Sequence, residues 1–172
     1  MVGKLKKYWL RTIIAIYVLI FVFQVIAAGV TVYALEHPEL GLFEREESTR
    51  NNIAVYGLTL GILISFVQGF FWYIIPFFCL VIYWHEDRKN IEFTRWGPSV
   101  YSGFFSYGLS MLMIWFADAF NDLSWLFFHE ASTWTDWFIN NFLLALLVGF
   151  GILFVLSLTT YYLAILVRYR KR

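Results

Sequence analysis

Charged residues are scarce in this chain, and its long apolar runs lack them altogether. Only 15% of the 172 residues are Asp, Glu, Lys or Arg, whereas 60% are hydrophobic and 22% aromatic, with a mean hydropathy of +0.66. A soluble domain is nearer half apolar and a quarter charged. The composition therefore indicates an integral membrane protein with one membrane domain, residues 1–172, and no separate soluble domain.

The chain also has only one cysteine and none of the sequence motifs of common enzymes. The single cysteine, Cys79, has no partner for an intrachain disulfide, so cysteine usage gives no information on compartment. No GxGxxG, P-loop, CxxC, HExxH or GxSxG pattern occurs. The absence of deep ionisable residues argues against a proton-coupled transporter built from one copy. It also argues against a haem-binding bundle, because His37, His85 and His129 fall at or outside the ends of the apolar runs.

Four apolar segments are long enough to cross a bilayer, whose hydrocarbon core of about 30 Å needs about 20 helical residues. They cover residues 12–35, 53–84, 99–117 and 137–167 approximately. Backbone amides find no other partner in lipid, so each segment is expected to be helical. Pro76 removes one backbone donor and favours a kink near Trp72. We predict an all-α fold, an integral membrane four-helix bundle.

The basic residues predict the orientation of this bundle. Four precede the first segment, three lie between the second and third, and four follow the fourth, so 11 of the 13 share one side. The other side holds nine of the 12 acidic residues. Because Lys and Arg favour the cytoplasmic side, both termini are predicted to be cytoplasmic. The first apolar run is longer than a signal-peptide core, so we expect it to be retained in a multi-pass protein of the plasma (cytoplasmic) membrane.

Small residues recur every four positions in three of the segments, which lets helix backbones approach closely. These rows are Gly57, Gly61, Ser65 and Gly69 in the second segment, Ser102, Ser106 and Ser110 in the third, and Ala145 and Gly149 in the fourth. Gln24 and Gln68 are the long polar side chains deep in the first two segments, at similar depths. They predict an interhelical hydrogen bond. The alternative is that they line a conduction path.

The segment ADAFNDLSWLFFHEASTWTDWF, residues 117–138, mixes acidic and aromatic side chains. Asp118 and Asp122 share one face if the third helix continues through them, and His129 and Glu130 follow. These four residues are candidate ligands for a divalent transition metal, and no other cofactor is predicted. A second interpretation is an amphipathic outer interfacial element at about residues 121–136, with aromatic side chains in the headgroup boundary and acids towards water. A third is a partner-binding surface. The interleaving of aromatic and acidic residues favours the interfacial element.

Three functions from different classes follow. The first is a non-catalytic accessory, assembly or scaffold subunit of a larger membrane complex, which the packing rows, the short loops and the lack of motifs favour. The second is an oligomeric channel or transporter with a polar path near Gln24 and Gln68. The third is a metal-dependent or redox membrane enzyme that uses the outward-facing carboxylates and histidine. We rank the accessory subunit first, the oligomeric channel or transporter second and the enzyme third. The expected partners are the lipid bilayer and other membrane subunits or copies of this chain, with no nucleic acid.

Overall fold

The fold is helical throughout the part of the chain that the structure describes. The computed structural model describes residues 2–37, 39, 47–89, 97–128, 137 and 141–169. Of these, 98% are helical. The helices are α1 (Val2–Glu36), α2 (Glu47–Tyr56), α3 (Leu58–Lys89), α4 (Gly97–Phe128) and α6 (Phe142–Tyr169). The prediction of an all-α fold is confirmed.

Four of these helices are long and apolar enough to cross a membrane. The apolar stretches are Tyr8–Glu36, Leu58–Glu86, Gly97–Phe128 and Phe142–Leu163, with 29, 29, 32 and 22 residues. At 1.5 Å per residue the shortest measures about 33 Å, which exceeds a hydrocarbon core of about 30 Å. Each predicted segment therefore corresponds to one long helix, although the boundaries differ.

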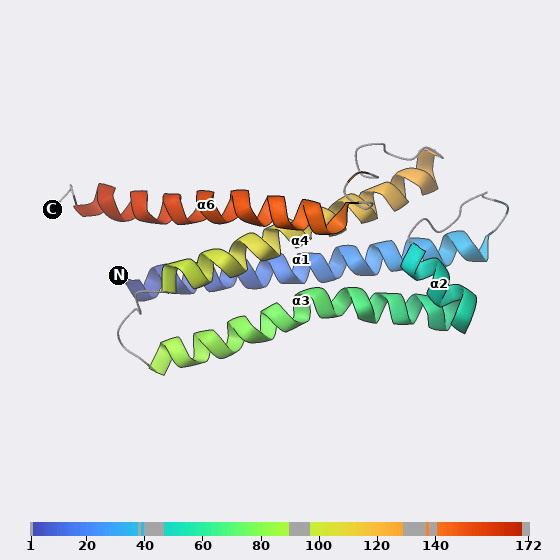
Figure 1. Cartoon of the computed structure of the whole chain (residues 1–172), viewed down its shortest axis with the longest axis horizontal. Coiled ribbons are helices and arrows are strands. Elements are labelled where there is room, and N and C mark those ends of the chain that lie inside the picture. The colour runs from blue at the N-terminus through green and yellow to red at the C-terminus, as the bar shows by residue number, and fades with distance from the viewer. Residues whose placement is uncertain are drawn as a thin grey trace.

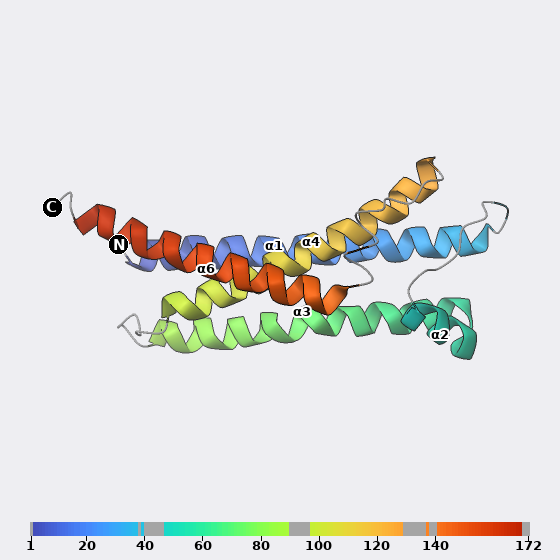
Figure 2. The same ribbon diagram turned by 45° about the horizontal axis from the view of Figure 1, so that its top comes forward.

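The long helices α1, α3, α4 and α6 run lengthwise alongside one another, with α4 at the centre (Figure 1). Helix α4 contacts α1, α3 and α6, and α1 also contacts α3. The start of α1 and the end of α6 lie at one end of the molecule, which we call the terminal end (Figure 1). Helix α2 packs against α3 at the opposite end, which we call the α2 end (Figure 2).

The chain folds back sharply at Gly57, between α2 and α3. Gly57 has a φ of 80°, a left-handed conformation that glycine adopts readily at the end of a helix. Its amide donates to the Ile53 carbonyl at 2.9 Å, and its own carbonyl accepts from the Gly61 amide at 2.8 Å. The two helices then lie so close that a Cβ on Gly61 would be 2.5 Å from the Ile53 Cα. The long helix begins at Leu58, not at Ile53 as hydropathy predicted, because Gly57 divides the apolar run.

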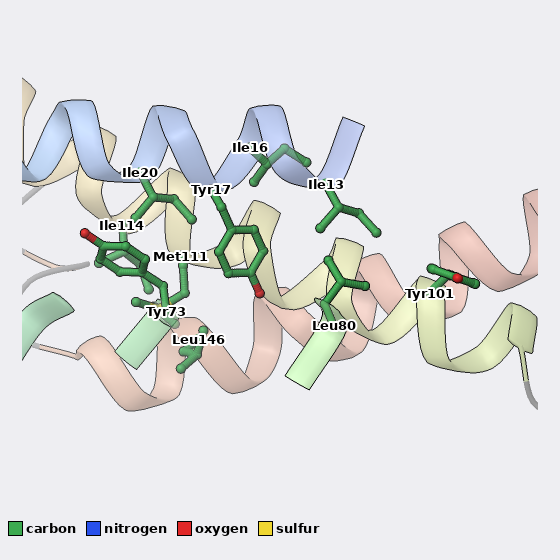
Figure 3. Close-up of a cluster of buried hydrophobic side chains, with 11 residues drawn as sticks. Ile13, Ile16, Tyr17, Ile20, Tyr73, Leu80, Tyr101, Met111, Ile114 and Leu146 are labelled. Carbon is green, nitrogen blue, oxygen red and sulfur yellow. The ribbon is translucent and has the colours of Figure 1, made fainter. Parts of the chain in front are cut away.

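The hydrophobic core lies where α1, α3 and α4 meet, and Leu146 of α6 also belongs to it (Figure 3). Ile13, Ile20, Leu80 and Met111 are fully buried there. Tyr17 inserts its ring beside α4 at a position where Gly108 has no side chain, since a Cβ there would be 2.8 Å from the ring carbon Cε2. These side chains bring the three helices into direct contact over the middle of their length.

The predicted small rows of α4 and α6 do pack against each other. Ser102, Ser106 and Ser110 are buried, with exposed fractions of 0%, 0% and 3%. The Ser106 Oγ lies 3.4 Å from the Ser157 Oγ of α6. A Cβ on Gly149 of α6 would be 3.1 Å from the Ser110 Oγ. The small side chains therefore allow α6 to approach α4 closely, as the spacing predicted.

Candidate functional site

Two regions carry polar chemistry: the α4 segment near the α2 end, and a set of hydrogen bonds deep between the helices. At the α2 end, α4 continues as one helix from Ala117 through Asp118 and Asp122 to Phe128. The two carboxylates therefore lie four residues apart on one helix face, as the sequence predicted for a continuous helix. Both are half-buried, and both interact with neighbouring groups.

The remaining members of the predicted metal site cannot be placed beside this pair. His129 and Glu130 lie outside the described residues. Among the residues that the structure does describe, no three His, Cys, Asp or Glu side chains come together in a group that could hold a metal ion. The structure thus joins two of the four predicted ligands on α4, and the metal site stays a prediction.

The predicted interfacial element is corrected in its first half. Residues Asn121 to Phe128 are the last turns of α4 and not a separate element. The physical reason is that no glycine or proline follows Gly108 in this helix, so nothing ends it where hydropathy falls. Asn121 is 4% exposed, whereas Phe127 and Phe128 are 70% and 74% exposed. The second half of the predicted element, residues 129–136, lies outside the described residues.

Deep between α1 and α3, Gln24 is the centre of a buried hydrogen-bond network. Gln24 is 1% exposed. Its Nε2 donates to the Phe66 carbonyl at 2.7 Å, and the Tyr73 hydroxyl donates to its Oε1 at 2.5 Å. Gly69 makes this approach possible, because a Cβ there would be 2.7 Å from the Gln24 Nε2. The Gln24 side chain therefore joins α1 to both the backbone and a side chain of α3.

The predicted hydrogen bond between Gln24 and Gln68 is wrong. The Gln68 Oε1 accepts instead from Asn52 Nδ2 of α2 at 3.1 Å, and the same Nδ2 donates to the Ser65 Oγ at 2.9 Å. Phe66, which meets Gln24, is two positions from Gln68, and each helical residue is rotated by about 100° from the last. The two glutamines thus have similar depths but face different neighbours, since α2 folds back against the face of α3 that carries Gln68.

A second deep contact connects α3 to α4. The Tyr107 hydroxyl donates to the Trp72 carbonyl at 2.5 Å. This is the carbonyl four residues before Pro76, which has no amide hydrogen to offer it. Helix α3 changes direction along its length (Figure 1), as is expected of a helix with an internal proline.

Sequence reasoning concentrated on the two glutamines and missed the tyrosines. Tyr17, Tyr73 and Tyr107 all lie in the middle part of apolar helices. A buried phenol normally finds a hydrogen-bond partner, so a tyrosine deep in a span is itself a signal. Two of the three act as donors here, while the Tyr17 hydroxyl has no hydrogen-bond partner among the described residues.

The four apolar helices and the polar contacts between them indicate an integral membrane protein of the helical class. No protein-family model matches the sequence, and the chain has no significant match among curated proteins or solved structures.

Proposed function

We propose that this chain is a non-catalytic accessory, assembly or scaffold subunit of a larger membrane complex. The observation that carries the proposal is how unequally the chain covers its own helices. In the most apolar window of each span, 44% of the α4 residues and 33% of the α1 residues are buried within the chain. The values are only 17% for α3 and 11% for α6. Most residues in these windows of α3 and α6 are therefore not buried within the chain, and their exposed side chains are left to lipid or to another protein.

An apolar helix of another membrane subunit fits the uncovered surface of α6. Leu147, Val148, Ile152 and Val155 are between 50% and 67% exposed. Aliphatic side chains offer van der Waals contacts but nothing that would orient a charged substrate. In lipid, such packing is the main source of helix association, because lipid tails are as apolar as leucine.

Gln24 and the serine row of α4, two of the groups proposed to line a conduction path, are used for packing in the single chain. Gln24 is buried and hydrogen-bonded to α3, and the serine row of α4 is buried against α6. A path through these groups would require the helices to separate. This favours the subunit over the oligomeric channel or transporter, which remains the second hypothesis.

We further propose that the terminal end faces the cytoplasm and that the protein resides in the plasma membrane. The support is the sequence distribution of Lys and Arg, which places 11 of the 13 beside the ends of the spans on that side.

The proposal is tested by photocrosslinking in native membranes. A diazirine analogue of leucine is introduced at Leu147, which is 67% exposed, and at the neighbouring Leu146, which is 7% exposed, as the matched control. We expect position 147 to give an adduct of one defined mass with a second membrane protein that also co-purifies with the tagged chain. Position 146 should give only internal products. Lipid adducts alone at position 147 and at exposed α3 positions such as Phe78 and Ile82 would refute the proposal.

A further inference from the structure

One turn of α3 contacts all three of the other long helices. The Tyr73 hydroxyl donates to Gln24 of α1, and the Trp72 carbonyl accepts from Tyr107 of α4. The Trp72 ring also packs against Phe142 of α6, with the ring centroids 5.6 Å apart. This turn is therefore one place where α3 is held by all three of the other long helices.

Pro76 lies one turn further along α3 and changes the chemistry of this attachment. Proline has no amide hydrogen, and its ring pushes against the carbonyl four residues earlier, so the helix cannot use the Trp72 carbonyl internally. In a bilayer, a carbonyl without a donor is costly, and such groups are usually satisfied by side chains of neighbouring helices. The Tyr107 hydroxyl supplies that donor at 2.5 Å.

The bend of α3 and the Tyr107 hydrogen bond are thus two parts of one arrangement. A bent helix exposes the Trp72 carbonyl towards α4, while a hydroxyl from α4 stabilises the bent form by binding it.

We propose that α3 is a hinged helix whose bend at Pro76 is latched by the Tyr107 hydroxyl. With the hydrogen bond made, α3 is held in the bent form shown in Figure 1. With it broken, the segment that follows Pro76 changes its angle to the segment that precedes it. The latch is a conformational device of the chain and does not depend on the proposed role as a subunit.

The single cysteine of the chain provides the readout. Cys79 lies three residues after Pro76 and is exposed, so a trifluoromethyl group attached to it reports on the hinged segment without any engineered site. The full chain is labelled in detergent, and its fluorine NMR spectrum is recorded. The matched control is Tyr17→Phe, which also removes a deep phenol hydroxyl, but one with no hydrogen-bond partner among the described residues.

We expect Tyr107→Phe to populate a second resonance and to raise the ratio of released to latched forms by about three- to thirtyfold, the range expected for one interhelical hydrogen bond in a membrane protein. Tyr17→Phe should keep a single resonance, and only its position should shift, because the Tyr17 hydroxyl lies near Cys79. Pro76→Ala restores the amide that bonds the Trp72 carbonyl within α3 and should give one resonance of its own. Adding Tyr107→Phe to that variant should change nothing further.

Two results would overturn the proposal. One is a Tyr107→Phe spectrum with a single resonance, as in Tyr17→Phe, because the hydroxyl would then not hold the bend. The other is the same response to Tyr107→Phe with and without Pro76, because Tyr107 would then act independently of the freed carbonyl. If Tyr107→Phe alone does not fold, recovery of folding in Pro76→Ala/Tyr107→Phe supports the latch, and failure to recover contradicts it.

Discussion

Tyr73→Phe is the most informative single change, because it removes one hydroxyl and leaves the aromatic ring in place. That hydroxyl donates to the Gln24 Oε1 at 2.5 Å, and Gln24 is 1% exposed. The variant therefore leaves an amide oxygen buried in an apolar environment without this donor. Interhelical hydrogen bonds in membranes contribute about 0.6 to 2 kcal/mol, and an unsatisfied buried polar group costs about 1–3 kcal/mol. We expect Tyr73→Phe to lower the free energy of unfolding by about 1–2 kcal/mol.

The loss is measured by titrating the protein with SDS in mixed micelles while following circular dichroism and tryptophan fluorescence. Tyr17→Phe is the matched control, because its hydroxyl is buried without a hydrogen-bond partner among the described residues. Removing that hydroxyl should leave the stability unchanged or raise it. Equal effects of the two variants would refute the assignment of the Gln24 network.

A double-mutant cycle then isolates the pair. Gln24→Leu removes the acceptor, so Tyr73→Phe in that background should cost less than it does alone. The sum of the stability losses in the two single variants should exceed the loss in Gln24→Leu/Tyr73→Phe by about 1 kcal/mol. Strictly additive losses would show that the two side chains do not interact.

The remaining predictions concern α2, the second glutamine and the acidic pair. Gly61→Ala should destabilise the protein by about 1–3 kcal/mol in the same SDS titration, because the added Cβ would lie 2.5 Å from α2 backbone atoms. The control is Gly151→Ala, where the added Cβ has open space, and it should be neutral or stabilising by up to about 1 kcal/mol. The reverse order would contradict the α2 packing. Gln68→Leu should change the stability by less than about 0.5 kcal/mol, since Gln68 is exposed, and a larger loss would contradict its surface position. Elemental analysis after gentle purification should find no stoichiometric transition metal. A stoichiometric metal in the wild type that is lost in D118N/D122N would instead favour the enzyme hypothesis.

Hydropathy and spacing predict the number and type of the long helices because these depend on local composition. The serine row of α4 was also predictable, since small residues at spacing four mark a face that a neighbour can approach. Hydropathy predicts the ends of the helices less well than their number. It falls at Asp118, yet α4 continues to Phe128, because a helix ends only where a breaker or a cap ends it.

The deep contacts could not be predicted from the sequence because depth does not determine which way a side chain faces. Gln24 and Gln68 have similar depths, but Gln24 meets Phe66 and Tyr73, while Gln68 meets Asn52. The turn at Gly57 decides this outcome by bringing α2 against one face of α3. Proline is more informative about a contact than the depth of a polar side chain, since Pro76 predicts that the Trp72 carbonyl has no partner within its helix. It does not identify the donor from another helix.

The mass of the particle extracted from native membranes tests the proposed role as a subunit most directly. The chain, tagged and expressed at its native level, is released in a mild detergent and weighed by native mass spectrometry. We predict a particle of defined composition that contains at least one different membrane protein together with this 20.4 kDa chain. A homogeneous particle that contains only this chain, with its uncovered helices occupied by lipid, would contradict the proposal.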